Sequence, residues 1–371
     1  MQTKTNIKVK IPWAKPTLFG NEKKYVSDAL DSTWISGGPY VEKFEKEFTR
    51  YNGTKYGITT SNGTTALQLA LLALGIGPGD EVIVPGFTFV APANMVIAVG
   101  AKPVYAEIDP LTWCIDPVSV ERSISDRTKA IIPVHIYGNV CDMDVLKTIA
   151  GKHNLAIIED TAEAAFSKYK EKYAGTFADI GCFSFQATKT ITMGEGGFVL
   201  TGNKKLYEKM CLFRDHGMQK DKRYWHDVIG YNFRLTNLQA ALGCAQLENL
   251  DKIISERQRV FRLYREHLTG EIGITMQHFT PEVKPVIWAI ALKIDSKVFQ
   301  GGRDFLIKAL SEVGIETRPG FYPFGVLPLY NAPRLPICEE VGANVISLPS
   351  FPQLTKEEIN FVCTHLKNLR R

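Results

Sequence analysis

Apolar and polar residues alternate along the first half of the chain in a rhythm that predicts strands separated by helices. Short apolar runs with the length of buried strands lie at 56–60, 81–85, 103–108, 129–138 and 155–160. Stretches with apolar residues at helical spacing lie between them, at 62–76, 91–101 and 142–154. Strands separated by helices form βαβ units, so we expect an α/β fold with a mostly parallel sheet covered on both faces.

Two further apolar runs, 180–185 and 196–202, lie close together in the sequence. The segment that joins them contains a single lysine, Lys189. It is too short for a crossover helix of normal length, so the two runs are either antiparallel neighbours or lie apart in the sheet.

The last third of the chain has a different pattern. One amphipathic pattern runs from 235 to 268, long enough to bridge two domains. An apolar run at 285–294 and helical patterns at 302–314 and 355–371 follow it. We therefore expect a large α/β domain over residues 1–250 and a smaller C-terminal α+β domain over residues 251–371.

The composition narrows the class of protein. The chain has 371 residues, of which 45% are apolar, enough for one large or two ordinary domains with filled cores. Its 44 Lys and Arg residues against 39 Asp and Glu residues give a net charge of +5. This balance is too even to indicate binding to nucleic acid or to an anionic membrane.

Cysteine and histidine usage bears on the compartment and on metals. The seven cysteines are scattered without Cys-x-x-Cys spacing, which argues against a disulfide framework or a zinc site and for a reducing compartment. The seven histidines form no His-x-x-x-His pair, so no metal site is expected. The first residues lack the apolar core of a signal peptide, and no apolar run is long enough to span a membrane, so a cytoplasmic protein is expected.

Polar residues follow two of the predicted strands at their carboxyl ends. Asn62, Gly63 and Thr64 open a helix after the first strand, and the free N–H groups at a helix start favour a phosphate. An ordinary helix cap accounts for the same residues. Asp160 ends the strand at 155–160, at the edge where open α/β sheets bind ligands, and the alternative is again a helix cap.

Lys189 decides between these interpretations. A lysine held between buried strands is desolvated, which lowers its pKa and makes its neutral amine a nucleophile toward aldehydes. A buried lysine, a strand-end carboxylate and a phosphate cradle are together what pyridoxal phosphate (PLP) requires. They supply an amine for its aldehyde, an acid that keeps its ring nitrogen protonated, and an anion site. The sequence therefore predicts a PLP enzyme.

Four stretches of the chain resemble the DegT/DnrJ/EryC1/StrS family of PLP-dependent sugar aminotransferases. They are SNGTTALQLALLALGIGPGDEVIVPGFTFVAPANM, IIEDTAEAAF, GTFADIGCFSFQATKTITMGEGGFVLT and RYWHDVIGYNFRLTNLQAALGCAQLENLD. The resemblance covers nearly the whole chain, from FGNEKKYVSDALDSTWISGG to the C-terminal domain. It implies the aspartate aminotransferase architecture, PLP fold type I, and a homodimer with active sites at the subunit interface.

Carried over residue by residue, the resemblance assigns roles to single positions. Lys189 corresponds to the lysine that bonds to the cofactor aldehyde, and Asp160 to the partner of the pyridine nitrogen. Glu163 falls near the ring hydroxyl, and Phe89 against the ring face, although without the resemblance Phe89 is interpreted as a core aromatic. The resemblance implies that the cofactor phosphate is held by Gly63, Thr64 and Ser184, with Asn232 contributed by the partner subunit.

Within the family, WISGG, RYWHDVIGYNFRLTN and GIETRPGFYP are most similar to the GDP-perosamine synthases, which aminate C4 of GDP-4-keto-6-deoxymannose. This similarity makes Arg223 and Arg318 candidates for contacts with the nucleotide phosphates, and solvated surface arginines are the alternative. The chain departs from these enzymes at 186–188, Gln-Ala-Thr, where they commonly carry an aromatic residue, Gly and Asn. It departs again at Gly325, where a histidine often stands.

The expected reaction transfers an amino group from L-glutamate to a nucleotide-linked keto-deoxysugar and releases 2-oxoglutarate. Lys189 moves the protons, and Asp160 keeps the cofactor ring an electron sink. Amination of a UDP- or dTDP-linked 3-keto or 4-keto sugar is an alternative within the same class. A PLP-dependent deoxysugar dehydratase is another, although that branch of the family replaces the lysine with histidine. A non-catalytic homologue that binds PLP or a sugar nucleotide is the third alternative.

Overall fold

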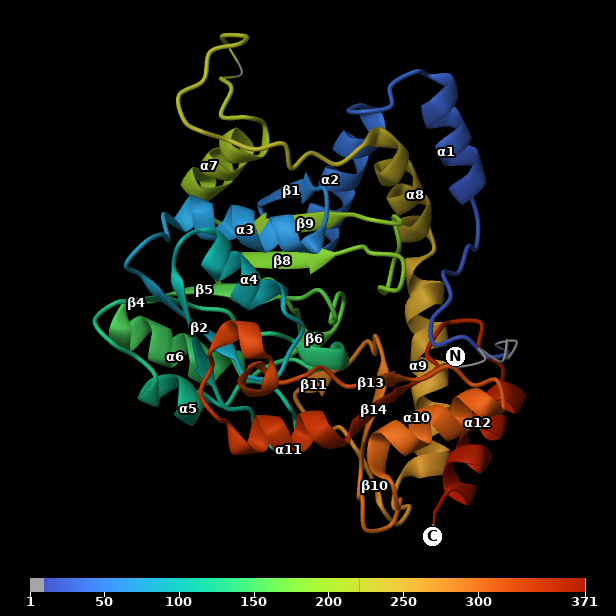
Figure 1. Ribbon diagram of the computed structural model, residues 1–371. Coiled ribbons are helices and arrows are strands. Elements are labelled where there is room, and N and C mark those ends of the chain that lie inside the picture. Colours follow the sequence, from blue (N-terminus) through green and yellow to red (C-terminus); the bar gives the residue numbers. More distant parts are fainter. Residues whose placement is uncertain (1–9, 220, 371) are drawn as a thin grey trace, which may run out of the picture.

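A seven-stranded sheet forms the centre of the computed structural model, which describes residues 10–219 and 221–370 (Figure 1). Across the sheet the strands follow the order β1 (Tyr56–Thr60), β9 (Gly197–Thr201), β8 (Ile180–Ser184), β5 (Ala156–Asp160), β4 (Thr128–Ile131), β2 (Glu81–Pro85) and β3 (Lys102–Ala106). β9 runs antiparallel to both of its neighbours, and the other neighbouring strands are parallel. The predicted mostly parallel sheet is confirmed, and the two runs that flank Lys189 are antiparallel neighbours.

Helices cover both faces of this sheet, which explains why its strands are apolar almost throughout. One face packs on α3 (Gly63–Leu74), α4 (Ala91–Ala98) and α7 (Lys204–Arg214). The other face packs on α2 (Pro39–Tyr51), α5 (Pro117–Arg122), α6 (Met143–His153) and α8 (Asn237–Glu248). Successive strand residues alternate between the faces: Cys182 belongs to the core under α3, and Phe183 to the core under α2.

The C-terminal part of the chain builds a second, smaller sheet. Its strands are all antiparallel and follow the order β10 (Ile274–Met276), β12 (Ile290–Ile294), β14 (Val345–Leu348) and β13 (Arg318–Pro319). Its core also includes residues of α9 (Leu250–Leu268), α10 (Gly302–Glu312) and α12 (Lys356–Asn368), and Figure 1 shows these helices together beside the sheet. This is the expected α+β unit, while the domain division at residue 250 remains a prediction.

The remaining elements pack around these two parts. They are α1 (Glu22–Asp31), α11 (Pro336–Asn344), a small sheet of β11 (Val283–Lys284), β6 (Lys168–Tyr169) and β7 (Lys172–Tyr173), and three short 3₁₀ turns at Ile136–Gly138, Phe324–Val326 and Pro328–Tyr330. Over residues 10–219 and 221–370, no helix has both the length and the apolar character needed to cross a membrane.

The single amphipathic helix expected over 235–268 is wrong, because the structure divides it into α8 and α9 at Asn249. Asn249 has φ −106° and ψ 17°, outside the helical range. Its side-chain amide donates back to the Ala245 carbonyl at 3.1 Å, which satisfies a carbonyl that the helix end leaves free. Consequently α8 packs beside α1 and α2, and α9 continues separately along α12.

Candidate active site

A cavity of about 820 Å³ lies where β5 and β8 end and α3 begins. Its walls include seven of the residues predicted from the sequence: Gly63, Thr64, Phe89, Asp160, Glu163, Ser184 and Lys189. These residues span more than a hundred positions of the sequence, from Gly63 to Lys189. They meet at the carboxyl edge of the sheet, where α/β folds bind ligands.

The start of α3 forms one wall of the cavity and has the properties of an anion site. The side chain of Asn62 accepts from the Thr65 N–H at 2.9 Å, and the first helical bond runs from Ala66 N–H to Asn62 O. The N–H groups of Gly63 and Thr64 come before that bond, so they are available to a ligand at the positive end of the helix dipole. A Cβ at position 63 would lie 2.8 Å from the Ser184 Cβ, so only glycine brings this backbone so close to the end of β8.

Asp160 lines the cavity at the end of β5 and is 5% exposed. Its main chain is held on both sides by the preceding segment, through bonds from Asp160 N–H to Pro133 O and from His135 N–H to Asp160 O. One carboxyl oxygen accepts from the Ala162 N–H at 3.0 Å. Burial raises the pKa of Asp160, and the Ala162 N–H, Lys189 and His135 oppose that rise. The carboxyl group is therefore suited to a cationic or N–H donor in the cavity.

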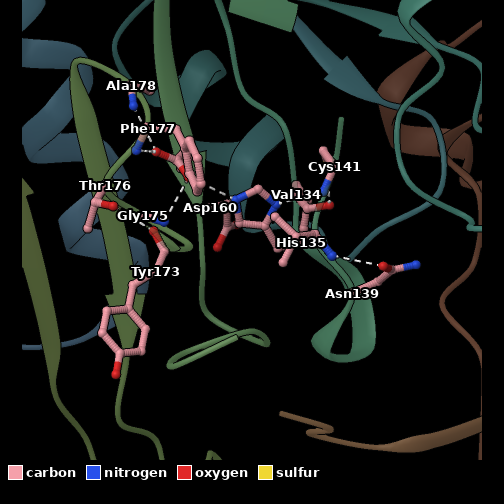
Figure 2. A network of polar contacts seen from close by, with 12 residues as sticks. Val134, His135, Asn139, Cys141, Asp160, Tyr173, Gly175, Thr176, Phe177 and Ala178 are labelled. Carbon is pink, nitrogen blue, oxygen red and sulfur yellow. Dashed lines mark hydrogen bonds and ion pairs between the residues drawn. The ribbon is translucent and has the colours of Figure 1, made fainter. Parts of the chain in front are cut away.

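Glu159 anchors the same strand from the side opposite the cavity, through the network in Figure 2. Its carboxylate accepts three backbone N–H groups of the loop 175–178, at 2.6 to 2.9 Å, and contacts His135 Nε2 at 3.1 Å. His135 Nδ1 accepts from the Cys141 N–H, so the ring proton lies on Nε2 and is donated to Glu159. The network fixes the segment 133–137 to β5, and with it the backbone on which Asp160 depends.

Lys189 and Glu163 face each other inside the cavity. Lys189 Nζ lies 3.9 Å from Glu163 Oε1, and the two side chains are 13% and 5% exposed. The other Glu163 oxygen accepts from the Tyr137 N–H at 2.8 Å. Burial lowers the pKa of Lys189, and burial raises the pKa of Glu163 to about 7, against the attraction of the Lys189 charge. The pair therefore titrates closer to neutral pH than free side chains, which suits proton transfer.

Two side chains that the sequence did not indicate hold the backbone around Lys189. Arg257 Nη2 donates to Lys189 O at 3.1 Å, and its Nη1 donates to the carbonyls of Ile287 and Trp288. Trp288 Nε1 donates to Thr188 O at 3.1 Å. Arg257 is buried, and burial lowers its pKa to about 10.

The signal for Arg257 is present in the sequence. Arg257 shares the apolar face of α9 with Ile253, Val260 and Tyr264, a position that a charged residue occupies only for a reason. Trp288, inside an apolar run, has no comparable signal.

Phe89 lies in the cavity wall and is 54% exposed, so its interpretation as a core aromatic is wrong. Arg318 lines an adjoining cavity of about 460 Å³ together with Phe89, and its guanidinium pairs with Glu316 at 2.5 Å.

Arg223 and Asn232 are not among the residues that line the cavity of this single chain. Arg223 is exposed, with its guanidinium 5.1 Å from the centre of the Tyr224 ring. Asn232 is exposed too, and its Oδ1 accepts from Arg234 Nε at 3.1 Å. Within the described ranges, no three His, Cys, Asp or Glu side chains gather in a way that could hold a metal ion.

Comparison with known proteins finds relatives over nearly the whole length. The chain is 44% identical over 356 residues to the GDP-perosamine synthase of Escherichia coli O157:H7, with 95% of this chain and 96% of that protein covered. It is 43% identical to the GDP-perosamine synthase of Caulobacter vibrioides, with 96% and 97% covered. Spr1654 of Streptococcus pneumoniae has been solved in forms named for PLP and for pyridoxamine phosphate (PMP), and both superpose with a TM-score of 0.92. The PMP form is 29% identical to this chain, with 97% of each chain covered.

A family model matches residues 16–367, almost the whole of the chain. The family match and the identity to the relatives extend over the segments that line the cavity at the carboxyl edge of the sheet. The chain belongs to the DegT/DnrJ/EryC1/StrS aminotransferase family.

Proposed function

We propose that the protein is a PLP-dependent aminotransferase that moves the amino group of L-glutamate onto C4 of GDP-4-keto-6-deoxymannose, to give GDP-perosamine. The identity to two GDP-perosamine synthases supports the choice of sugar nucleotide. The observation that carries the proposal is the buried Lys189 amine, 3.9 Å from Glu163 in a cavity that Asp160 and the start of α3 also line.

The residues of the cavity fit the cofactor. The N–H groups of Gly63 and Thr64 at the start of α3 suit the phosphate, and a side chain at position 63 would fill that cradle. Ser184 ends the neighbouring strand and adds a hydroxyl donor. Asp160, whose carboxyl group has room for a further donor, suits the protonated ring nitrogen. The exposed face of Phe89 suits stacking on the ring.

When bound, pyridoxal phosphate supplies an aldehyde that accepts the amino group and a ring that delocalises the electrons left after a proton departs. The chain supplies the proton transfers. Because burial lowers the pKa of Lys189, its Nζ loses its proton more readily than a solvated lysine does, and it is suited to take the proton from Cα of the amino donor and to return one at the keto carbon. Glu163, 3.9 Å away, keeps this amine in the cavity and balances its charge when it is protonated.

The assembly belongs to the proposal. Asn232 and Arg223 are exposed and lie outside the cavity of their own chain, which fits a contribution of Asn232 to the cofactor phosphate of the partner subunit. In a homodimer of this kind each active site is shared between two subunits. Arg223 and Arg318 remain the candidates for the nucleotide phosphates, and Arg318 is already beside the cavity.

A turnover screen with L-glutamate and GDP-, UDP- and dTDP-linked 3-keto and 4-keto sugars tests the proposal. We expect an amino sugar and 2-oxoglutarate from GDP-4-keto-6-deoxymannose, and no sugar product without glutamate. If a UDP- or dTDP-linked sugar is aminated faster, that sugar is the substrate instead. A deoxygenated product formed without glutamate would show that the enzyme is a dehydratase. If no sugar is turned over, the protein is a non-catalytic binding protein.

A further inference from the structure

The closest ring to the Lys189 amine belongs to Trp288. Lys189 Nζ lies 3.7 Å from the centre of the indole ring, nearer than the 3.9 Å to Glu163 Oε1, which is beyond hydrogen-bond reach. The same indole donates its Nε1–H to the carbonyl of Thr188, the residue before the lysine. One side chain therefore contacts the charged tip of Lys189 and the carbonyl of the peptide bond that precedes this residue.

The indole ring cannot readily turn away, because other aromatic rings surround it. Trp13 meets it edge-on, with 5.5 Å between the ring centres, and Tyr137 and Phe321 lie parallel to it at 6.2 and 6.5 Å. Trp288 is 8% exposed. Arg257 adds a second hold, since it donates to the carbonyl of Trp288 and to the carbonyl of Lys189.

The surroundings of Nζ make this contact consequential. The lysine is 13% exposed, so its ammonium has lost most of its water, and the face of an indole ring is the best aromatic replacement for it. The charged groups around it are Asp160 at the end of β5, Glu163 after that strand, Glu195 in the cavity wall, Arg257 on α9, and Lys15 beside a small neighbouring cavity. Two carboxyl groups attract the ammonium, and Arg257 repels it.

We infer that Trp288 is a positioning residue that holds the free Lys189 amine inside the cavity while the lysine is not bonded to the cofactor. This inference rests on the proposed function, in which Lys189 is released by the amino donor and must return after the sugar is aminated. The ring favours the ammonium form over its face, and the Nε1–H keeps the backbone of 188–189 in place. The amine thus stays within reach of the substrate carbons during both halves of the reaction.

Trace acetylation of the enzyme loaded with pyridoxamine phosphate tests this role, because Lys189 is then a free amine. The enzyme is exposed to a small amount of acetic anhydride at a series of pH values, and mass spectrometry quantifies the peptide that contains Lys189. Only the neutral amine reacts, so the pH midpoint of labelling reports how strongly the ammonium is stabilised. Trp288→Met keeps an apolar side chain in the space and removes the ring face and the N–H group.

We expect Trp288→Met to lower the labelling midpoint of Lys189 by about one pH unit, with about fivefold more label at a pH one unit below the wild-type midpoint. Trp288→Phe keeps a weaker ring and should lower the midpoint by about half as much. Phe19→Leu, which removes a ring 4.4 Å from Lys252 Nζ outside the cavity, should leave the Lys189 midpoint unchanged.

An unchanged or raised midpoint in Trp288→Met overturns the inference. If Trp288→Met does not fold, all its lysines will be labelled alike. The test then rests on Trp288→Phe, and an unchanged Lys189 midpoint in that variant overturns the inference. Borohydride reduction of the PLP form separates this from the proposed function: cofactor fixed to another lysine refutes the role of Lys189. Cofactor fixed to Lys189 together with an unchanged midpoint refutes only the role of Trp288.

Discussion

Replacement of Glu163 by Gln should stabilise the cofactor-free protein, and increasingly so as the pH rises. Glu163 is 4% exposed, and burial raises its pKa from about 4.5 to about 7. An acid whose pKa is raised in the folded state binds its proton more tightly there, so its ionisation lowers the free energy of unfolding as the pH rises from about 4.5 to 7. A shift of this size corresponds to about 1 kcal/mol at pH 5 and about 3 kcal/mol at pH 8.

Glutamine is the neutral counterpart of the protonated acid. Its carbonyl oxygen still accepts the Tyr137 N–H that Glu163 accepts at 2.8 Å, so the substitution removes the charge without opening a cavity. Urea unfolding followed by tryptophan fluorescence at pH 5 and pH 8 measures the difference. Glu312→Gln, on the exposed side of α10, controls for the loss of one negative charge. The linkage is refuted if the free energies of unfolding of Glu163→Gln and wild type differ by the same amount at both pH values. It is also refuted if Glu163→Gln is less stable than wild type at pH 8.

Four further outcomes follow from the site. Lys189→Ala should abolish turnover, and borohydride treatment of the wild type should fix the cofactor to the peptide of Lys189, as mass spectrometry would show. Asp160→Asn should lower kcat by about 10²-fold or more, because the charge that holds the ring proton is lost; near-normal kcat would make Asp160 a helix cap. Glu159→Gln turns an amide toward three backbone N–H groups and His135, and should lower the free energy of unfolding by about 2 kcal/mol in urea titrations. Mixing inactive Lys189→Ala and Asn232→Asp chains should restore about a quarter of wild-type turnover after random subunit exchange, and no recovery despite verified exchange would make each site the property of one chain.

The local patterns of the sequence predicted what depends on neighbouring residues. Apolar runs predicted the strands, and the start of α3 at Gly63 lies where the Asn62 cap signal put it. Asp160 and Glu163 lie in the cavity because β5 ends at Asp160, a boundary already visible in the sequence. Such features follow from the length and periodicity of single elements.

Contacts between distant segments were not predictable in the same way. The division of 235–268 at Asn249 depends on a helix-end bond and on α1 packing beside α8, neither of which changes the apolar periodicity. Trp288 looked like any apolar residue of a strand, and its role depends on a segment a hundred residues earlier. Asn232 is exposed in the single chain, so its proposed role depends on a second subunit.

The two members of the Lys189–Glu163 pair are held by different parts of the fold. Asp160 and Glu163 take their positions from β5 and the segment 133–137 within the large sheet, through His135 and the Tyr137 N–H. The backbone of Lys189 is fixed instead by Arg257 of α9 and by Trp288, just before β12 of the smaller sheet. Any displacement of the C-terminal part against the large sheet therefore changes the 3.9 Å separation of Lys189 Nζ and Glu163 directly. The Coulomb energy of two charges varies inversely with their distance and is larger in a buried site than in water, so the protonation of Lys189 is coupled to how the two parts are packed together.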